Sequence, residues 1–129
     1  MTRPFPIPTT ALVLTALFTL GACSRTPVDP IVCDLSMRAG ITVTIKDAAT
    51  LEPLAANARG VVRDGAYVDS LVLIAPDTRV AAYERAGTYS VEVRLAGYQN
   101  FTASGLRVTA GTCHVNAVVV PALLLKLRS

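Results

Sequence analysis

Apolar and polar residues alternate along several short stretches of the chain. In residues 41–46 the odd positions are apolar and the even positions are polar. Residues 87–95 alternate in the same way, with tyrosine, valine and leucine on one side and serine, glutamate and arginine on the other. A period of two places the apolar side chains on one face of a strand, whereas an amphipathic helix repeats every three to four residues. These stretches therefore predict strands with one buried face.

Further strand-like segments follow one another between turn residues. We predict seven strands, at residues 41–46, 57–63, 66–74, 78–84, 87–95, 101–108 and 113–127. Asp64 and Gly65 predict a hairpin with a type I′ turn, and Gly105 predicts a bend within the sixth strand. Ala81 and Ala82 leave a helical turn as an alternative within the fourth. Many short strands between turns are typical of an all-β sandwich or barrel.

Composition narrows the class of protein. The 129 residues are 52% hydrophobic and 16% charged, which argues against a disordered chain. Twelve basic and nine acidic residues give a net charge of +3, which is small and scattered along the chain. We therefore expect no nucleic-acid partner, because such proteins concentrate positive charge on one face. With one histidine and three cysteines, we also expect no metal and no other cofactor.

An apolar run near the start of the chain predicts an export signal. Residues 11–20 are apolar except for two threonines, and small residues follow them. The run is too short to cross a bilayer as a helix, which takes about 20 residues. It has the length of the hydrophobic region of a signal peptide. We predict that residues 1–22 are a signal peptide that is removed on export.

The residues that close this segment resemble a bacterial lipoprotein motif. Leu20, Gly21, Ala22 and Cys23 match the lipobox, in which an apolar residue and two small residues precede a cysteine. The resemblance implies that Cys23 carries a diacylglyceryl group and an acylated amino terminus. Several acyl chains anchor a protein stably. Ser24, where lipoproteins kept in the inner membrane tend to have aspartate, implies the outer membrane. The alternative is an ordinary secretory signal with a chance cysteine, which would give a soluble periplasmic binding protein.

The odd number of cysteines fits this interpretation. If Cys23 is lipidated, Cys33 and Cys113 remain. Beyond the inner membrane the compartment is oxidising, so we predict a disulfide between them. Two buried thiols or a redox pair are the alternatives, although no Cys-x-x-Cys spacing is present.

Two further segments resemble carboxypeptidase regulatory-like domains. Residues 43–58 contain a strand, an aspartate, a threonine three positions on, a proline with an aliphatic residue, and then small residues. Residues 87–98 contain a Gly-x-Tyr that opens an alternating strand ending in Gly-Tyr. The resemblance implies a seven-stranded, transthyretin-like Greek-key sandwich over residues 40–129. The lipidated cysteine and an extended tether would occupy residues 23–39.

One residue departs from the family pattern. The family often has glycine after the threonine, and Leu51 occupies that position here. A positive φ is costly for leucine. We therefore expect the first turn to take a different shape.

No cluster of residues points to catalysis. His114 is alone beside Cys113, so we expect a surface or hydrogen-bonded histidine rather than a metal ligand or the base of a triad. No Gly-x-Ser-x-Gly motif is present, and the acidic residues are too scattered to indicate a glycosidase pair. We predict no catalytic residue. A sugar-stacking platform is an alternative role for the tyrosines, which are Tyr67, Tyr83, Tyr89 and Tyr98.

The C-terminal run at residues 118–125 is apolar on both faces of a strand, with Pro121 indicating an edge or a bulge. Either a loop covers its second face, which we expect, or it presents an apolar strip to lipid or a partner. The sequence thus predicts a lipid-anchored cell-envelope module with a non-catalytic binding, adhesive or structural role. Its partners would be the membrane, through Cys23, and an envelope protein or polysaccharide. The alternatives are a carbohydrate-binding accessory protein and a small hydrolase.

Overall fold

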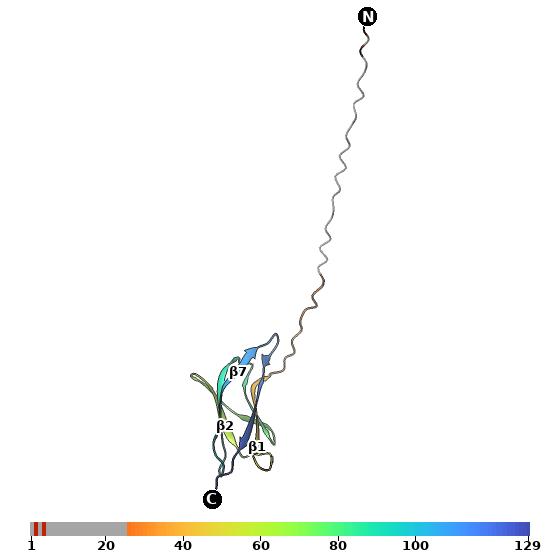
Figure 1. Cartoon of the computed structure of the whole chain (residues 1–129). Helices are drawn as coiled ribbons and strands as arrows, with labels where there is room; N and C mark the ends of the chain where they lie inside the picture. The colour runs from red at the N-terminus through yellow and green to blue at the C-terminus, as the bar shows by residue number, and fades with distance from the viewer. Residues whose placement is uncertain (1, 3, 5–25) are drawn as a thin grey trace. The chain divides into compact units, whose positions relative to one another are not determined.

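The computed structural model describes residues 2, 4 and 26–129 (Figure 1). The predicted lipidation site, Cys23, and all but two residues of the predicted signal peptide lie outside the described residues. Residues 26–38 are exposed and have no regular secondary structure. Residues 32–129 form one compact unit. Within the described part of the chain, no helix is long and apolar enough to cross a membrane.

Two sheets make up the compact unit, which confirms the predicted all-β sandwich (Figure 1). One sheet has the order β4-β5-β1-β9 and the other the order β3-β2-β6-β7-β8. β1 pairs with β5 in antiparallel and with β9 in parallel orientation. The strands are β1 (Ala39–Asp47), β2 (Arg59–Asp64), β3 (Tyr67–Ser70), β4 (Val72–Ala75), β5 (Thr78–Tyr83), β6 (Gly87–Arg94), β7 (Phe101–Ala110), β8 (Val115–Asn116) and β9 (Val118–Leu124).

The core lies between the two sheets and follows from the period of two. Ile41, Val43 and Ile45 of β1 are fully buried, as is Val93 of β6. Tyr89 of β6 is 1% exposed. Each buried aliphatic side chain of this size stabilises the fold by about 1.5–3 kcal/mol relative to an exposed one. The alternation in the sequence therefore predicted the inward faces of both strands.

Two of the seven predicted segments are each divided into two strands. Residues 66–74 form β3 in one sheet and β4 in the other, with the buried Leu71 between them. The Leu71 N–H donates to the carbonyl of Gly60 at 2.9 Å, which fixes the crossing. The prediction of one strand was wrong because both halves are extended and no glycine or proline separates them. The predicted strand at residues 113–127 was also wrong, because Cys113 and His114 lie in a bend before β8 and β9.

The turns agree with the sequence in position but not always in type. Asp64 and Tyr67 close the β2–β3 hairpin, and Gly65 has a φ of 57°. A type I′ turn needs positive φ at both central residues. Ala66 has no positive φ, so the predicted turn type was wrong. The bend at Gly105 is confirmed by its φ of 70° and by a register shift between β6 and β7. The alternative of a helical turn at residues 81–82 was wrong, since both residues belong to β5.

The turn after β1 closes around Asp47. Its Oδ1 accepts hydrogen bonds from the N–H groups of Ala49 at 2.8 Å and Thr50 at 3.0 Å. The Leu51 N–H donates to the Asp47 carbonyl at 2.9 Å. Leu51 adopts a φ of 61°. The expectation that leucine would avoid this conformation was therefore wrong, because the aspartate bonds hold the turn closed around it.

Candidate functional site

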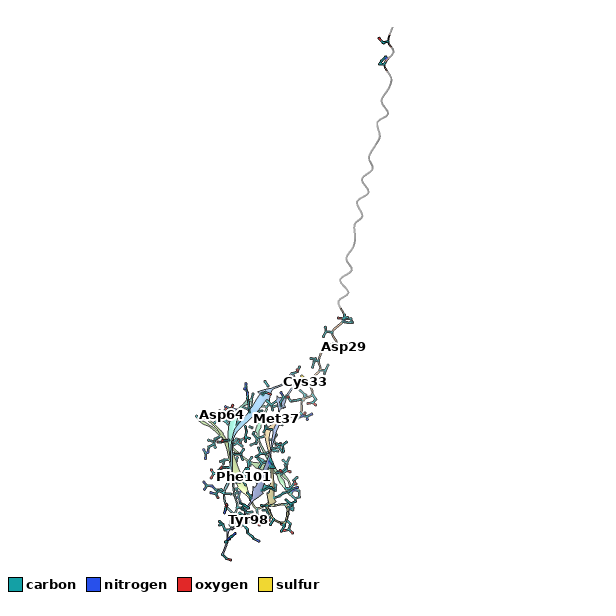
Figure 2. All side chains as sticks on the ribbon, viewed as in Figure 1. Asp29, Cys33, Met37, Asp64, Tyr98 and Phe101 are labelled. Carbon is teal, nitrogen blue, oxygen red and sulfur yellow. A yellow bond between two sulfur atoms is a disulfide. The ribbon has the colours of Figure 1, made fainter. Side chains whose placement is uncertain are left out.

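A disulfide joins the segment before β1 to the bend after β7. The Cα atoms of Cys33 and Cys113 are 5.3 Å apart, and the residues are 80 positions apart in sequence. The predicted pairing is therefore confirmed. In the chain-entropy account, closing a loop of this length stabilises the fold by up to about 4.5 kcal/mol. Cys33 lies at the end of the sandwich opposite Tyr98 (Figure 2).

Next to the disulfide, His114 lies between two carboxylates. Its Nε2 is 2.9 Å from Oδ1 of Asp34, and its Nδ1 is 2.7 Å from Oε1 of Glu84. The hydrogen bond to Glu84 is the largest cause that raises the pKa of His114, and the bond to Asp34 adds to it against desolvation. The imidazolium form donates to both acids. The expectation of a hydrogen-bonded histidine is confirmed.

The same arrangement explains why His114 does not form a triad in the described structure. The Ser36 hydroxyl donates to Asp34 and not to the imidazole. Both ring nitrogens face carboxylates, so neither offers a lone pair to a metal ion. Among residues 26–129, no group of three or more histidine, cysteine, aspartate or glutamate side chains is arranged to hold a metal ion. The cluster instead connects the N-terminal segment to the residues around β5 and β8.

Tyr89 lies inside the sandwich, and the half-buried Tyr67 packs against it. The rings of Tyr67 and Tyr89 meet edge to face, with centroids 6.1 Å apart. The Arg85 guanidinium lies 3.9 Å from the centroid of Tyr67 and donates to the Tyr89 hydroxyl at 2.8 Å. It also pairs with Asp64 at 2.8 Å. These contacts fix the β2–β3 hairpin against the start of β6.

A third tyrosine connects the two segments that resemble the regulatory-like family. The Tyr98 hydroxyl donates to Oδ2 of Asp47 at 2.8 Å. The backbone bond from Thr50 is the largest cause that lowers the pKa of Asp47, followed by the bond from Tyr98. Tyr83, the fourth tyrosine, lies in the other sheet from Tyr67 and Tyr89. The hypothesis of a shared tyrosine platform was therefore wrong.

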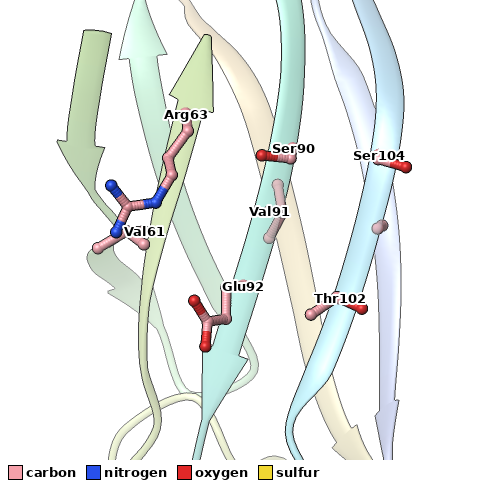
Figure 3. Close-up of a pocket in the computed structure, with 8 residues that line it drawn as sticks. Val61, Arg63, Ser90, Val91, Glu92, Thr102 and Ser104 are labelled. Atoms are coloured by element: carbon pink, nitrogen blue, oxygen red, sulfur yellow. The ribbon is translucent and has the colours of Figure 1, made fainter. Parts of the chain in front are cut away.

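The outer face of the five-stranded sheet carries a polar groove that spans three strands. Strand alternation buries Val62 and Val93 and turns their neighbours outward. Two adjoining hollows of about 430 and 250 Å³ share the side chains of Val61, Arg63 and Glu92. Figure 3 shows the smaller hollow from this face. We call this surface the outer groove, and its polar lining consists of Arg59, Arg63, Ser70, Arg79, Ser90, Glu92, Arg94, Thr102 and Ser104.

Positive charge collects at one end of the outer groove. The strand register places Arg59 of β2 directly opposite Arg94 of β6. Arg79 of β5, in the other sheet, reaches the same hollow. Its guanidinium donates to the carbonyls of Ala55 at 2.7 Å, Leu71 at 2.9 Å and Ala56 at 3.4 Å. Desolvation is the largest cause that lowers the pKa of Arg79, and the charge of Arg59 adds to it.

Only one of these cations is neutralised by an acid. Glu92 pairs with Arg94. Across the part of the chain that the structure describes, no carboxylate forms an ion pair with Arg59, Arg63 or Arg79. Sequence reasoning missed the outer groove. The alternation in each strand marked its outward residues, but the pairing of β2 with β6 was needed to bring them together.

The edge strand β9 leaves an apolar strip exposed on the other sheet. Val119 is 64% and Leu123 is 48% exposed, and they lie opposite Thr42 and Lys46 of β1. Pro121 lies between them, and β9 is the last strand of its sheet. The edge position is confirmed. The expectation that a loop covers this face was wrong for the described residues.

No family model matches the chain, and a search of curated proteins found no match. The resemblances to lipoproteins and to regulatory-like domains therefore depend on the residues quoted for them.

Proposed function

We propose that this protein is a lipid-anchored β-sandwich of the bacterial cell envelope with a non-catalytic binding role. The observation that carries the proposal is the disulfide between Cys33 and Cys113. Of the three cysteines in the chain, this pairing leaves Cys23. Cys23 is also the cysteine that follows an apolar run and two small residues. A disulfide is typical of an exported protein, and the remaining thiol is free to accept lipid.

The role of the anchor is to hold the sandwich near a membrane surface. Acyl chains on Cys23 would lie in the bilayer, and residues 24–32 would connect them to the disulfide at Cys33. A fully extended segment of this length reaches at most about 30 Å. Residues 26–32 are exposed and have no regular structure, which suits a tether. The sandwich would therefore contact molecules close to the membrane.

The contact between Asp47 and Tyr98 supports a regulatory-like domain. The two residues come from the two segments that resemble this family, and a hydrogen bond of 2.8 Å joins them. Such a bond gives a reason for the two patterns to occur in one chain. Members of the family are mostly accessory, adhesive or scaffolding modules. The outer groove is the surface on which we expect binding.

Fractionation of cells tests the anchor. The protein should sediment with membranes and should be dissolved only by detergent. The Cys23→Ala variant cannot be acylated at this position, so no acylated protein should enter the detergent phase. The matched control is the double variant Cys33→Ala/Cys113→Ala, which loses two cysteines but should stay with the membranes. Equal behaviour of Cys23→Ala and the unaltered protein would contradict the proposal.

A further inference from the structure

We propose that the outer groove binds the carboxylate groups of an acidic polysaccharide, such as one built from uronic acids. The inference rests on the proposed binding role and names its ligand class. Arg59 and Arg63 would hold the carboxylates, with the charge of Arg79 beside them. The hydroxyl and carboxylate side chains beside them would bind the hydroxyl groups of the sugars.

The facing pair Arg59 and Arg94 is the first reason. Like charges directly opposite each other on neighbouring strands destabilise a sheet. Here the register produces such a pair, and Arg79 adds a third cation to the same hollow. Glu92 offsets only Arg94. A bound carboxylate would relieve this repulsion, and guanidinium groups bind carboxylates with two parallel hydrogen bonds.

The mixture of groups along the outer groove favours a sugar over a phosphate polymer. Ser90 and Glu92 of β6 lie beside Arg63, and Thr102 and Ser104 continue the polar surface on β7 (Figure 3). Hydroxyls and a carboxylate accept hydrogen bonds from sugar hydroxyls. A chain of phosphates alone has no hydroxyl groups to donate to these acceptors. Acidic sugars, by contrast, offer both anionic and hydroxyl groups.

The size of the outer groove fits an extended ligand. The larger hollow, of about 430 Å³, lies within the usual range for small-ligand sites of about 300–1,000 Å³. The smaller hollow adjoins it through Val61, Arg63 and Glu92. An oligosaccharide crossing β2, β6 and β7 would therefore contact cations in one hollow and hydroxyl side chains in the other.

Binding of a labelled oligogalacturonate tests the inference. The protein is used as recovered from cells, in neutral detergent, and fluorescence anisotropy measures the affinity. We expect saturable binding that weakens as salt is added. The variants Arg59→Gln and Arg63→Gln should each lose affinity by about tenfold, the value of one charge-assisted hydrogen bond. Both side chains are exposed, so the fold should persist.

A matched control separates the outer groove from general charge attraction. Arg38 is exposed and precedes β1 of the other sheet, and Arg38→Gln makes the same change of charge. It should leave the affinity within a factor of about two. Equal losses from Arg38→Gln and Arg59→Gln would overturn the assignment. So would equal binding of the methyl-esterified oligomer, which keeps the hydroxyls but lacks the negative charge.

Competition with anionic vesicles tests whether the outer groove binds a lipid headgroup instead of a polysaccharide. Vesicles containing phosphatidylglycerol should compete weakly with the oligogalacturonate. If the vesicles bind more tightly than the oligogalacturonate and Arg59→Gln weakens vesicle binding, the ligand is a lipid headgroup and the polysaccharide assignment is wrong. Membrane fractionation of the same variants keeps the two proposals apart. An anchored protein without oligogalacturonate binding refutes the ligand alone, and binding by a protein that is not anchored refutes the anchor alone.

Discussion

Leu51 holds a backbone conformation that suits glycine better. Its φ is 61°, and its side chain is 60% exposed, so little apolar contact depends on it. The left-handed conformation costs a leucine roughly 1–2 kcal/mol. Glycine avoids this cost, but its more flexible unfolded chain lowers the free energy of unfolding by about 0.4–1 kcal/mol. We expect Leu51→Gly to raise the free energy of unfolding by about 0.5–1 kcal/mol, measured by urea denaturation.

Ala49 provides the control for this change. It is exposed in the same turn and has no positive φ. Ala49→Gly should therefore destabilise the protein by about 0.4–1 kcal/mol. A lower urea midpoint for Leu51→Gly than for the unaltered protein would show that the turn does not strain the leucine.

The hydroxyl of Tyr98 donates a hydrogen bond to Asp47. Tyr98→Phe keeps the ring but removes a hydrogen bond to a carboxylate that is 7% exposed. The midpoint of urea unfolding should fall, and the pKa of Asp47 should rise, because the Tyr98 bond helps to lower it. NMR titration of the Asp47 carboxyl measures the second effect. Tyr83 pairs with Ala39, at the opposite end of β1 from Asp47. Tyr83→Phe should therefore change neither quantity, and a similar loss in both variants would contradict this role of the Tyr98 hydroxyl.

The residue pattern of a single strand did not predict which side chains face each other across the outer groove. The alternation in β2 and β6 identifies Arg59 and Arg94 as outward residues. Their direct opposition depends on the register between strands that are distant in the sequence. Side-chain alternation fixes a face, but only the pairing of strands fixes a neighbour.

At the scale of elements, the contacts of His114 tie the segment before β1 to the end of β5. Its pKa is raised in the folded protein, above all by Glu84, so its stabilising effect is complete below 6.5 and disappears as the pH rises through the raised value. The pKa values of Asp34 and Glu84 are lowered, in first place by the bonds from Ser36 and from the Arg38 N–H. The stabilising effect of Asp34 is present above pH 3.8 and that of Glu84 above pH 4.5, and both disappear in acid.

The free energy of unfolding should therefore be highest between about pH 4.5 and 6.5 and should fall on the alkaline side. The variant His114→Gln keeps hydrogen bonding but cannot become charged. Urea denaturation at a series of pH values from about 5.5 upward, through the raised pKa of the histidine, should show a smaller fall in stability for this variant. An unchanged pH dependence would rule out His114 as its source.

The disulfide should contribute more stability than any other single connection between these elements. Reduction of Cys33–Cys113 frees the segment before β1 and should lower the free energy of unfolding by up to about 4.5 kcal/mol. Urea midpoints with and without a reductant measure the effect. Reductant should not change the midpoint of the double variant Cys33→Ala/Cys113→Ala. No effect of reductant on the unaltered protein would contradict the account.

Element boundaries were harder to predict than the presence of strands. Residues 66–74 contain no glycine or proline that would mark the crossing between sheets at Leu71. The crossing depends on the hydrogen bond to Gly60, which comes from another strand. The bend at Cys113 and His114 likewise depends on partners far along the chain, namely Cys33, Asp34 and Glu84.

For the whole molecule, the sandwich and the cysteine pairing were predicted from the sequence, whereas the outer groove was not. A period of two in β1 and β6 was sufficient for the fold class. The disulfide was predicted because the assignment of Cys23 to lipid leaves only Cys33 and Cys113. The outer groove needed the order β3-β2-β6-β7, in which strands distant in the sequence are neighbours. Local patterns do not contain this order.

The mass of the mature protein shows whether Cys23 carries the anchor. Intact-mass spectrometry of the protein recovered from membranes, with fragmentation of its amino terminus, identifies both the first residue and any added group. The account predicts a chain that begins at Cys23 and carries the mass of a diacylglyceryl group. A chain that begins at any other residue, or a Cys23 without acyl mass, would contradict it.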